Sequence, residues 1–150
     1  MFKIYVDADS CPVKQEVYRV ANRYGIKVIL VANKALNIPE EVLVELVVVD
    51  NGQDAVDDWI TANVNKNDIV ITADIPLASR TVKKGARILS PRGIAFNESS
   101  IGDTLATRDL MTHLRDIGMV TGGPPAFGKK DRSKFLQALD SLIQAIRNGK

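Results

Sequence analysis

The segment D-I-V-I-T-A-D-I-P-L-A, residues 68–78, joins a run of apolar, mostly β-branched residues to an acid and then to a proline. A run that is apolar at nearly every position is typical of a strand covered on both faces, as in a parallel sheet with helices on either side. Pro76 favours the first turn of a helix, and Gly85 marks the end of that helix. The segment therefore predicts a buried strand, a connection containing Asp74 and a helix over 76–84.

Apolar runs alternate with amphipathic segments in the same way along the first part of the chain. The predicted strands are 3–6, 27–32, 46–50, 68–73 and 86–89, and the predicted helices are 12–24, 53–64 and 76–84. Strands that alternate with helices are joined by right-handed crossovers in a parallel sheet. We therefore expect an α/β fold, a three-layer α/β/α sandwich with a mainly parallel sheet.

The last third of the chain is expected to add C-terminal helices to this sandwich. Residues 99–117 and a final helix after Asp131 carry apolar side chains at helical spacing. Residues 122–130, G-G-P-P-A-F-G-K-K, are rich in turn formers, and Asp131 is expected to cap the helix that follows them. Because we find no repeat and no linker, residues 1–150 are expected to form one domain.

Composition excludes several classes of protein. One cysteine, Cys11, permits no internal disulfide, and one histidine, His113, leaves almost no material for zinc sites or histidine-based triads. Aromatic residues make up 5% of the chain, which argues against the base-stacking platforms of single-strand binders. No apolar stretch suits a signal peptide or a membrane helix, so we expect a cytoplasmic protein without a membrane partner.

The distribution of charge is more informative than the net charge of +2. No lysine or arginine lies between Ala35 and Asn65, a stretch that holds seven acids, whereas Ile75 to Arg92 holds five basic residues and no acid. A second basic group lies within 129–134. An acidic centre bordered by basic stretches suits a metal site that handles a phosphate polymer, although solvated helix faces give the same pattern.

Aspartates recur at the predicted carboxyl ends of three strands. Asp7 and Asp9 follow the first strand, Asp54 and Asp57 follow the third, and Asp74 follows the fourth. Ligands of open parallel sheets bind outside these strand ends, so we expect the carboxylates to share one cleft. Crowded carboxylates repel one another unless a cation offsets their charge, and hard oxygen ligands select Mg²⁺ or Mn²⁺.

Each of these acids also has a structural interpretation. Asp54 and Asp74 are placed to cap the helices after them, and Asp57 or Asp58 to lie near the positive end of a helix. These alternatives weaken when they are taken together, because acids recur at several strand ends that the fold should bring together. Thr72 could hydrogen-bond a phosphate or a ligating carboxylate, but it is better explained as a β-branched strand residue.

Four motifs spread over essentially the whole chain carry a resemblance to a known family. They are V-D-A-D-S-C-P-V-K at 6–14, G-Q-D-A-V-D-D-W-I at 52–60, D-I-V-I-T-A-D-I-P-L-A at 68–78, and G-G-P-P-A-F with D-R-S-K-F at 122–127 and 131–135. Their order resembles the YaiI/YqxD family of bacterial proteins, which is similar to PIN-like and NYN nuclease domains. The resemblance implies a PIN-like fold with an acidic metal cluster formed by Asp7, by Asp54 or Asp57, and by Asp74. It supports the fold more than the reaction.

These residues favour a metal-dependent nuclease that hydrolyses phosphodiester bonds of RNA or DNA, with RNA the expected partner. Mg²⁺ or Mn²⁺ would polarise the scissile phosphate and lower the pKa of a bound water. The candidate catalytic residues are Asp7, Asp9, Asp54, Asp57 and Asp74, all but Asp9 as metal ligands, and the candidate phosphate-binding residues are Arg80, Lys83, Lys84, Arg87, Lys129 and Lys130.

Other functions stay open, as does a homo-oligomeric state. A non-catalytic nucleic-acid-binding or regulatory module could keep the same fold, and binding without turnover would identify it. D-A-D-S-C also resembles the strand end of haloacid-dehalogenase phosphatases, but those enzymes need a lysine before a later acidic pair, where this chain has no basic residue. A cysteine phosphatase fits less well still, because Val17 stands where its loop needs an arginine.

Overall fold

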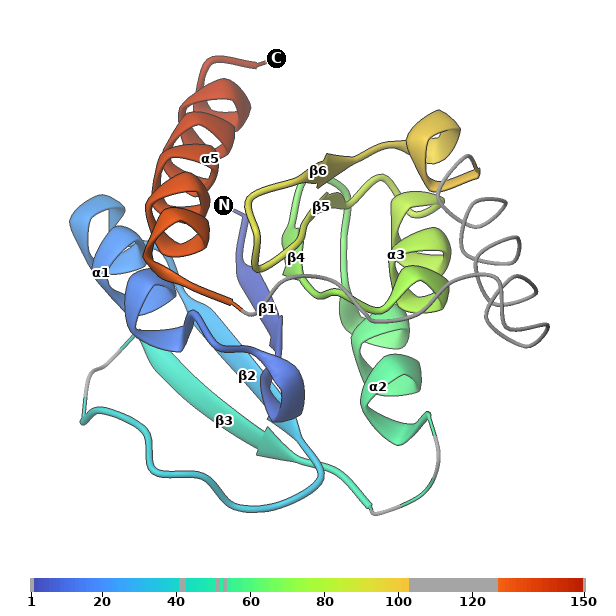
Figure 1. Ribbon diagram of the computed structural model, residues 1–150. Coiled ribbons are helices and arrows are strands. Elements are labelled where there is room, and N and C mark those ends of the chain that lie inside the picture. The colour runs from blue at the N-terminus through green and yellow to red at the C-terminus, as the bar shows by residue number, and fades with distance from the viewer. Residues whose placement is uncertain (1, 41–42, 51, 53, 103–126, 150) are drawn as a thin grey trace, which may run out of the picture.

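A six-stranded sheet forms the centre of the computed structural model, which describes all residues except 1, 41–42, 51, 53, 103–126 and 150 (Figure 1). The strands are β1 (Ile4–Asp7), β2 (Val28–Ala32), β3 (Val44–Val48), β4 (Ile69–Ile71), β5 (Arg87–Leu89) and β6 (Ala95–Phe96). The helices described with both ends are the short 3-10 helix η1 (Ala8–Ser10), α1 (Lys14–Tyr24), α2 (Ala55–Asn63), α3 (Ile75–Val82) and α5 (Lys129–Arg147). The sheet order is β3-β2-β1-β4-β5-β6, and all pairs are parallel except β5 with β6.

Helices cover both faces of the sheet, which confirms the three-layer α/β/α sandwich and its mainly parallel sheet. In Figure 1, α1 and α5 lie over one face and α2 and α3 over the other. Alternate residues of each strand enter two separate cores: Ile4 and Val6 pack on the α1 and α5 side, and Tyr5 packs on the α2 and α3 side. Burial on both faces explains why these strands are apolar at nearly every position.

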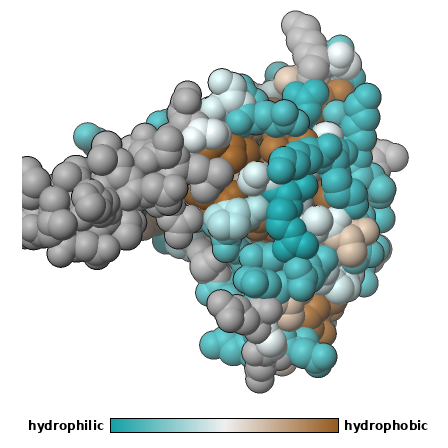
Figure 2. Space-filling view, turned by 90° about the vertical axis from the view of Figure 1, so that its right-hand side faces the viewer, coloured by the Kyte–Doolittle hydropathy of each residue, from teal (hydrophilic) through white to brown (hydrophobic). Residues whose placement is uncertain are grey.

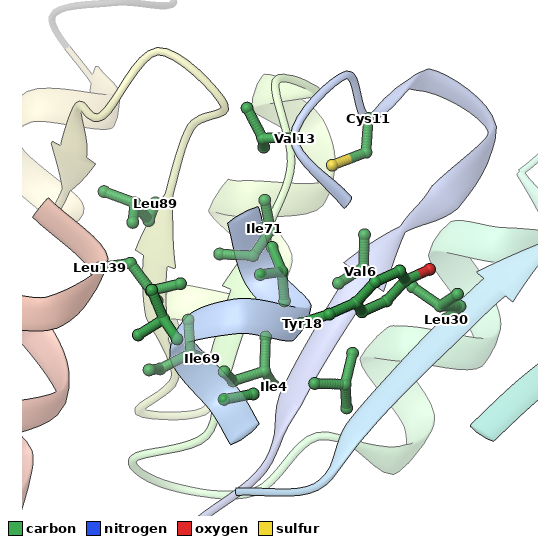
Figure 3. Close-up of a cluster of buried hydrophobic side chains, with 14 of the residues drawn as sticks. Ile4, Val6, Cys11, Val13, Tyr18, Leu30, Ile69, Ile71, Leu89 and Leu139 are labelled. Atoms are coloured by element: carbon green, nitrogen blue, oxygen red, sulfur yellow. The ribbon is translucent and has the colours of Figure 1, made fainter. Parts of the chain in front are cut away.

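The core beside α1 is completed by α5. Phe135, Leu139 and Ile143 of α5 are fully buried, one helical turn apart, and Figure 3 shows Leu139 directed toward the same cluster as Ile69 of β4 and Leu89 of β5. The spacing of the apolar residues therefore located the buried side of this helix correctly. Within the described part of the chain, no helix is both long enough and apolar enough to cross a bilayer.

The chain reverses its direction of growth beside β1. It runs outward from β1 to β2 and β3, and then returns to place β4 on the other side of β1, with Ile4 in register with both Val28 and Ile69. This reversal is a topological switch point, where the loops leaving β1 and β4 diverge to opposite faces of the sheet. Open parallel sheets bind ligands at such a point, outside the carboxyl ends of the strands.

β6 adds a strand that was not expected. It follows a turn in which Ser90 N donates to Ile94 O and Gly93 N donates to Ser90 O, each at 2.9 Å, and it places Phe96 opposite Ile88. A two-residue strand is too short to show an alternating pattern in the sequence. β3 also begins two residues before the expected strand 46–50.

The final helix starts earlier than expected. Lys129 begins α5, so Asp131 lies in its first turn, and the expectation that Asp131 precedes the helix was wrong. Its Oδ2 accepts a hydrogen bond from Gly128 N at 3.0 Å, which satisfies an amide at the helix start from within the helix. Lys129 and Lys130, expected in the loop 122–130, therefore belong to α5.

The preceding helix, expected over 99–117, is only partly covered by the structure. Residues 98–102 are helical, and Ile101 is buried against the α2 and α3 side of the sheet. The remainder of that expected helix, with His113, lies outside the described residues, as do residues 122–126 of the expected loop.

Gly93 fixes the turn before β6 against α5. Its φ is +82°, and a Cβ at this position would lie 2.9 Å from the carbonyl carbon and oxygen of Lys134. Gly25, at the end of α1, has a φ of +67° and open space where its Cβ would be. The two glycines therefore share a left-handed conformation but only Gly93 also makes a close approach.

We expect Gly93→Ala to lower the free energy of unfolding by more than Gly25→Ala. Both variants bear the left-handed conformation, which costs roughly 1–2 kcal/mol, and only Gly93→Ala adds a collision with backbone, about 1–3 kcal/mol more. Urea denaturation of the wild type and the two variants measures the difference. Equal losses in the two variants would show that the turn is not held tightly against α5.

Candidate functional site

Five aspartates line one hollow at the carboxyl edge of the sheet, beside the switch point. Its volume is about 200 Å³, and it is lined by Asp7, Asp9, Asn33, Gly52, Asp54, Ala55, Val56, Asp57 and Asp74. These residues come from the ends of β1 and β2, from η1 and from the starts of α2 and α3. We call this feature the acidic hollow. The structure thus brings together all five candidate aspartates, which are far apart in the sequence.

Thr72 connects the two strand ends on either side of the switch point. Its hydroxyl accepts a hydrogen bond from Asp74 N at 3.0 Å and lies 3.1 Å from Asp7 Oδ2. Because a carboxylate has no proton to donate, the Thr72 hydroxyl donates its single proton to Asp7. Thr72 itself is 2% exposed, whereas both of its hydrogen bonds are partly buried. Thr72 therefore orients the Asp7 carboxylate, the role that the sequence had favoured less than a plain strand residue.

Asp74 has a structural role as well as its place in the acidic hollow. It is the N-cap of α3, and its Oδ1 accepts a hydrogen bond from Leu77 N at 3.1 Å. The capping interpretation of Asp74 is therefore confirmed. The capping bond fixes the orientation of the Asp74 carboxylate but uses only its Oδ1. Capping α3 is therefore compatible with a place in the acidic hollow.

Asp54 does not cap α2 with its side chain. It occupies the N-cap position with a φ of +66° and a ψ of 9°, and its side chain makes no capping hydrogen bond. Aspartate tolerates this left-handed conformation better than most residues, although the conformation still has a cost. The exposed Asp54 side chain borders the hollow, so simple capping does not explain it.

Asp57, in the first turn of α2, has a carboxyl group whose charged form is disfavoured in the hollow. Its pKa is raised from an ordinary 3.8 to about 6, and burial of the carboxyl group is the largest cause. The negative charges of Asp74, Asp7 and Asp54 add to the rise, in that order, and Arg80 opposes it. A carboxyl group shifted in this way by desolvation and by specific like charges in a hollow is a functional-site candidate.

Asp9 and Asn33 close the side of the hollow nearest to β2. Asp9 Oδ2 accepts a hydrogen bond from Asn33 N at 2.9 Å, and Asn33 Nδ2 donates to Asp50 O at 3.0 Å. Asn33 was not a candidate. The signal that could have found it is its position just beyond an apolar run, the same rule that located Asp7 and Asp74.

Asp58, Arg80 of α3 and Lys84 just after α3 do not line the hollow. Asp58 pairs with Arg80 at 2.9 Å, and Lys84 Nζ donates to Thr61 O at 2.6 Å, so both cations are engaged by α2. Figure 2 shows that the face carrying α2 and α3 is mostly hydrophilic. Charged side chains here therefore behave at least partly as a solvated helix surface.

Lys83, Lys84 and Arg87 stand at the opposite edge of the sheet from the hollow. Asp74 precedes α3, whereas Lys83 and Lys84 follow it and Arg87 begins β5. The turn between them packs at the amino end of β4, where a Cβ on Gly85 would lie 3.0 Å from Lys66 Cγ. An eight-residue helix, about 12 Å long, separates these residues from Asp74.

Lys129 and Lys130 lie nearer to the carboxyl edge. They begin α5 and are exposed, next to Phe127, which contributes to the same surface as Ala73 and Ser90 beyond the ends of β4 and β5. Of the two groups of basic residues expected to bind phosphate, the one at the start of α5 therefore shares an edge with the acidic hollow.

The acidic hollow suits a hard divalent cation by its donor chemistry. Carboxylate oxygens are the ligands that Mg²⁺ and Mn²⁺ prefer, and the raised pKa of Asp57 shows negative charge that a cation would offset. However, among the residues that the structure describes, no group of three or more His, Cys, Asp or Glu side chains is arranged closely enough to hold an ion. The hollow therefore supplies carboxylate oxygens, but these are not arranged as a complete set of metal ligands.

Cys11 offers no nucleophile for a phosphatase. Its side chain is buried in the core, and burial raises the pKa of the thiol to about 11, so the reactive thiolate is strongly disfavoured. The interpretation of Cys11 as a small packing residue at a helix start agrees with this position.

Comparison with known proteins places the whole region of the site within one family. The chain matches the family described as "Uncharacterized BCR, YaiI/YqxD family" over residues 5–145. A UPF0178 protein of Rhodopseudomonas palustris (strain BisB5) is 56% identical over 144 residues, 96% of this chain and 88% of that protein. A UPF0178 protein of Nitrobacter winogradskyi is 55% identical over 145 residues, 97% of this chain and 92% of that protein. The names of these relatives state no activity.

The repulsion at Asp57 gives a testable dependence of stability on pH. Because its folded-state pKa is raised, the contribution of Asp57 to stability is present below about pH 4 and is lost as the pH rises through about 6. We expect Asp57→Asn, in the presence of EDTA, to gain stability over the wild type progressively between these pH values and to keep that gain above them. Thermal unfolding across this range measures it.

Asp58→Asn is the matched control for this measurement. It removes a carboxylate from the same turn of α2 but outside the acidic hollow, and so corrects for the lost charge near the helix start. A stability difference between Asp57→Asn and the wild type that stays constant across the range would contradict the assignment of the repulsion to Asp57.

Proposed function

We propose that this chain, which belongs to the YaiI/YqxD family, is a Mg²⁺- or Mn²⁺-dependent nuclease of the PIN-like type that hydrolyses phosphodiester bonds. One observation carries the proposal: aspartates from separate strand ends line a single hollow at the switch point, where burial and then the charges of Asp74, Asp7 and Asp54 raise the pKa of Asp57. Unrelieved repulsion lowers stability, so a hollow that retains several like charges suggests a cationic ligand.

Asp7, Asp57 and Asp74 are the residues proposed to hold the metal. When bound, Mg²⁺ or Mn²⁺ supplies Lewis-acid polarisation of a phosphate oxygen and lowers the pKa of a coordinated water. Asp54, exposed at the rim, is the further candidate ligand. We place Asp57 ahead of Asp54 because Asp57 is the more buried carboxylate and responds to all three of its neighbours.

The surrounding residues are proposed to orient these ligands. Thr72 is a positioning residue, because its hydroxyl proton fixes one oxygen of Asp7 and its oxygen holds the Asp74 amide. Asp9, held by Asn33 N, is suited to orient a water at the edge of the hollow. Hydrogen bonds of this kind hold metal ligands ready and typically change metal affinity or activity by roughly 10–100-fold.

A non-catalytic nucleic-acid-binding module is the second candidate. The observation that favours it is the absence, among the described side chains, of a group arranged to hold one ion. In that case the hollow would exclude phosphate rather than process it, and the basic start of α5 would carry the binding. Divalent-dependent turnover distinguishes the two candidates.

We expect Asp7→Asn and Asp57→Asn each to reduce Mn²⁺-dependent cleavage of single-stranded RNA by about 100-fold or more, because each removes a proposed ligand. Glu45→Gln is the control, since it neutralises an exposed acid on β3 that is paired with Lys27 and is not part of the hollow. Product formation is followed on denaturing gels against metal concentration. Wild-type binding without products at any Mg²⁺ or Mn²⁺ concentration would support the module instead.

The edge on which each basic group lies predicts which group binds the flanking phosphates. Lys129→Glu with Lys130→Glu should weaken binding of an oligonucleotide and flatten its salt dependence by roughly one unit of slope per lost contact. Acids in the first turn of α5 favour the helix, so folding should be retained. Lys83→Glu with Lys84→Glu is the matched comparison at the opposite edge and should change affinity and slope little.

Affinity measured by fluorescence anisotropy over a range of salt concentrations separates the two double variants. If the substitutions at Lys83 and Lys84 carry the larger loss, the strand crosses the α3 surface and the assignment to α5 is wrong.

A further inference from the structure

A second hollow lies on the same carboxyl edge of the sheet as the acidic hollow. Its volume is about 230 Å³, and it is lined by Pro12, Ala73, Ser90, Pro91, Arg92 and Phe127. We call it the aromatic hollow. Ala73 lines this hollow, and Asp74, the next residue of the chain, lines the acidic one.

We propose that the aromatic hollow binds one nucleobase of the strand whose phosphate lies at the acidic hollow. The inference rests on the proposed function, because it takes a phosphate polymer as the occupant of the acidic hollow. It also goes beyond that function: it assigns a base subsite, and it makes a single-stranded substrate the preferred one, since a base must leave the stack to enter.

Phe127 supplies the aromatic surface for a base. The ring is half-buried and packs against the core beneath α1, so it is held from below while it lines the hollow. The guanidinium carbons of Arg92 and Arg132 lie 5.7 and 5.1 Å from the ring centroid. Bases stack on both aromatic rings and arginine guanidinium planes, largely without regard to sequence.

The hydrogen bonds around the hollow hold these groups in place. Arg92 Nη1 donates to Asp131 Oδ2 at 3.3 Å, and Arg132 Nη1 donates to Pro12 O at 2.9 Å and to Glu16 Oε1 at 3.0 Å. The turn that carries Arg92 is closed by Ser90 Oγ, which accepts from Arg92 N and Ile94 N. Side chains fixed in this way lose little freedom when a planar ligand binds.

The charge around the aromatic hollow suits a nucleotide better than an apolar ligand. Arg92 lines the hollow and Arg132 lies over its phenylalanine ring, and each arginine pairs with one acid, Asp131 or Glu16. The first two turns of α5, which carry Arg132, also carry the exposed side chains of Lys129, Lys130 and Lys134. A base in the hollow would place its backbone between the proposed metal ligands and these lysines.

The low aromatic content of the chain limits the site to a single base. Phe127 is the one aromatic residue that lines this hollow among the described residues, so an extended stacking platform is not implied. Pro12 and Pro91 complete the apolar walls, and neither has a backbone N–H that would compete for the edge of the base.

Abasic probes test this subsite directly. A fluorescein-labelled short oligoadenylate, intact or with one abasic residue placed at each position in turn, is titrated with the full chain by anisotropy, with Ca²⁺ replacing Mg²⁺ to slow hydrolysis. The wild type should lose affinity, on the order of tenfold, at one abasic position. In Phe127→Leu that position should lose its effect, while the intact probe binds more weakly by a similar factor.

Two further variants separate stacking from general loss of structure. Phe127→Trp keeps an aromatic surface and should retain the abasic effect, whereas Phe2→Leu removes a phenylalanine at the amino edge of the sheet and should behave as wild type. Thermal unfolding of each variant confirms that it is folded. The subsite is overturned if abasic substitution has the same effect in the wild type and in Phe127→Leu at every position, or if no probe binds.

The same samples distinguish this inference from the proposed function. Suppose that the intact probe is cleaved in Mn²⁺ but that no abasic position has an effect that depends on Phe127. This result would support the nuclease and contradict the base subsite. Coupling to one base without cleavage would remove the nuclease and leave a base-binding site on a non-catalytic module.

Discussion

The position of β1 between β2 and β4 is the constraint on which the rest of the structure depends. Because the chain grows away from β1 in both directions, the loops after β1 and β4 part toward opposite faces and leave a hollow between them. The side chains that line this hollow are mostly acidic, and the buried Val56 is among the few apolar ones. Thr72 then ties the two loops together by one hydroxyl that accepts on one side and donates on the other.

In the acidic hollow, the like charges of neighbouring aspartates lower the stability of the fold. Each aspartate alone has a local partner or position that explains it, as with the Asp74 cap and the Asp9 bond to Asn33. Burial of Asp57, together with the charges of Asp74, Asp7 and Asp54, raises the pKa of its carboxyl group. When residues that are each tolerated on their own together lower the stability of the fold, the site is typically one that serves function.

Much of the fold and the aspartates of the site could be predicted because both follow from periodicity and strand direction. Buried parallel strands are apolar throughout, and an acid directly after such a run must lie at the carboxyl edge, which located Asp7 and Asp74. The features that the sequence did not predict depend on tertiary contacts. They are the two-residue strand β6, the left-handed backbone of Asp54 and the hydrogen bond from Gly128 N to the Asp131 carboxylate. The basic residues after Asp74 were close to it in sequence, but α3 carries them to the other edge.

The packing of α5 beside α1 has a consequence for synthesis of the chain. Phe135, Leu139 and Ile143 complete a core whose other side chains come from the first third of the sequence and from β4 and β5. While the ribosome makes the chain, the part of that face that α5 covers therefore stays open to water until residues 129–147 emerge. Contacts of such long sequence separation slow folding and expose apolar surface in the meantime. The nascent protein is thus most in need of chaperone protection just before its last helix is made.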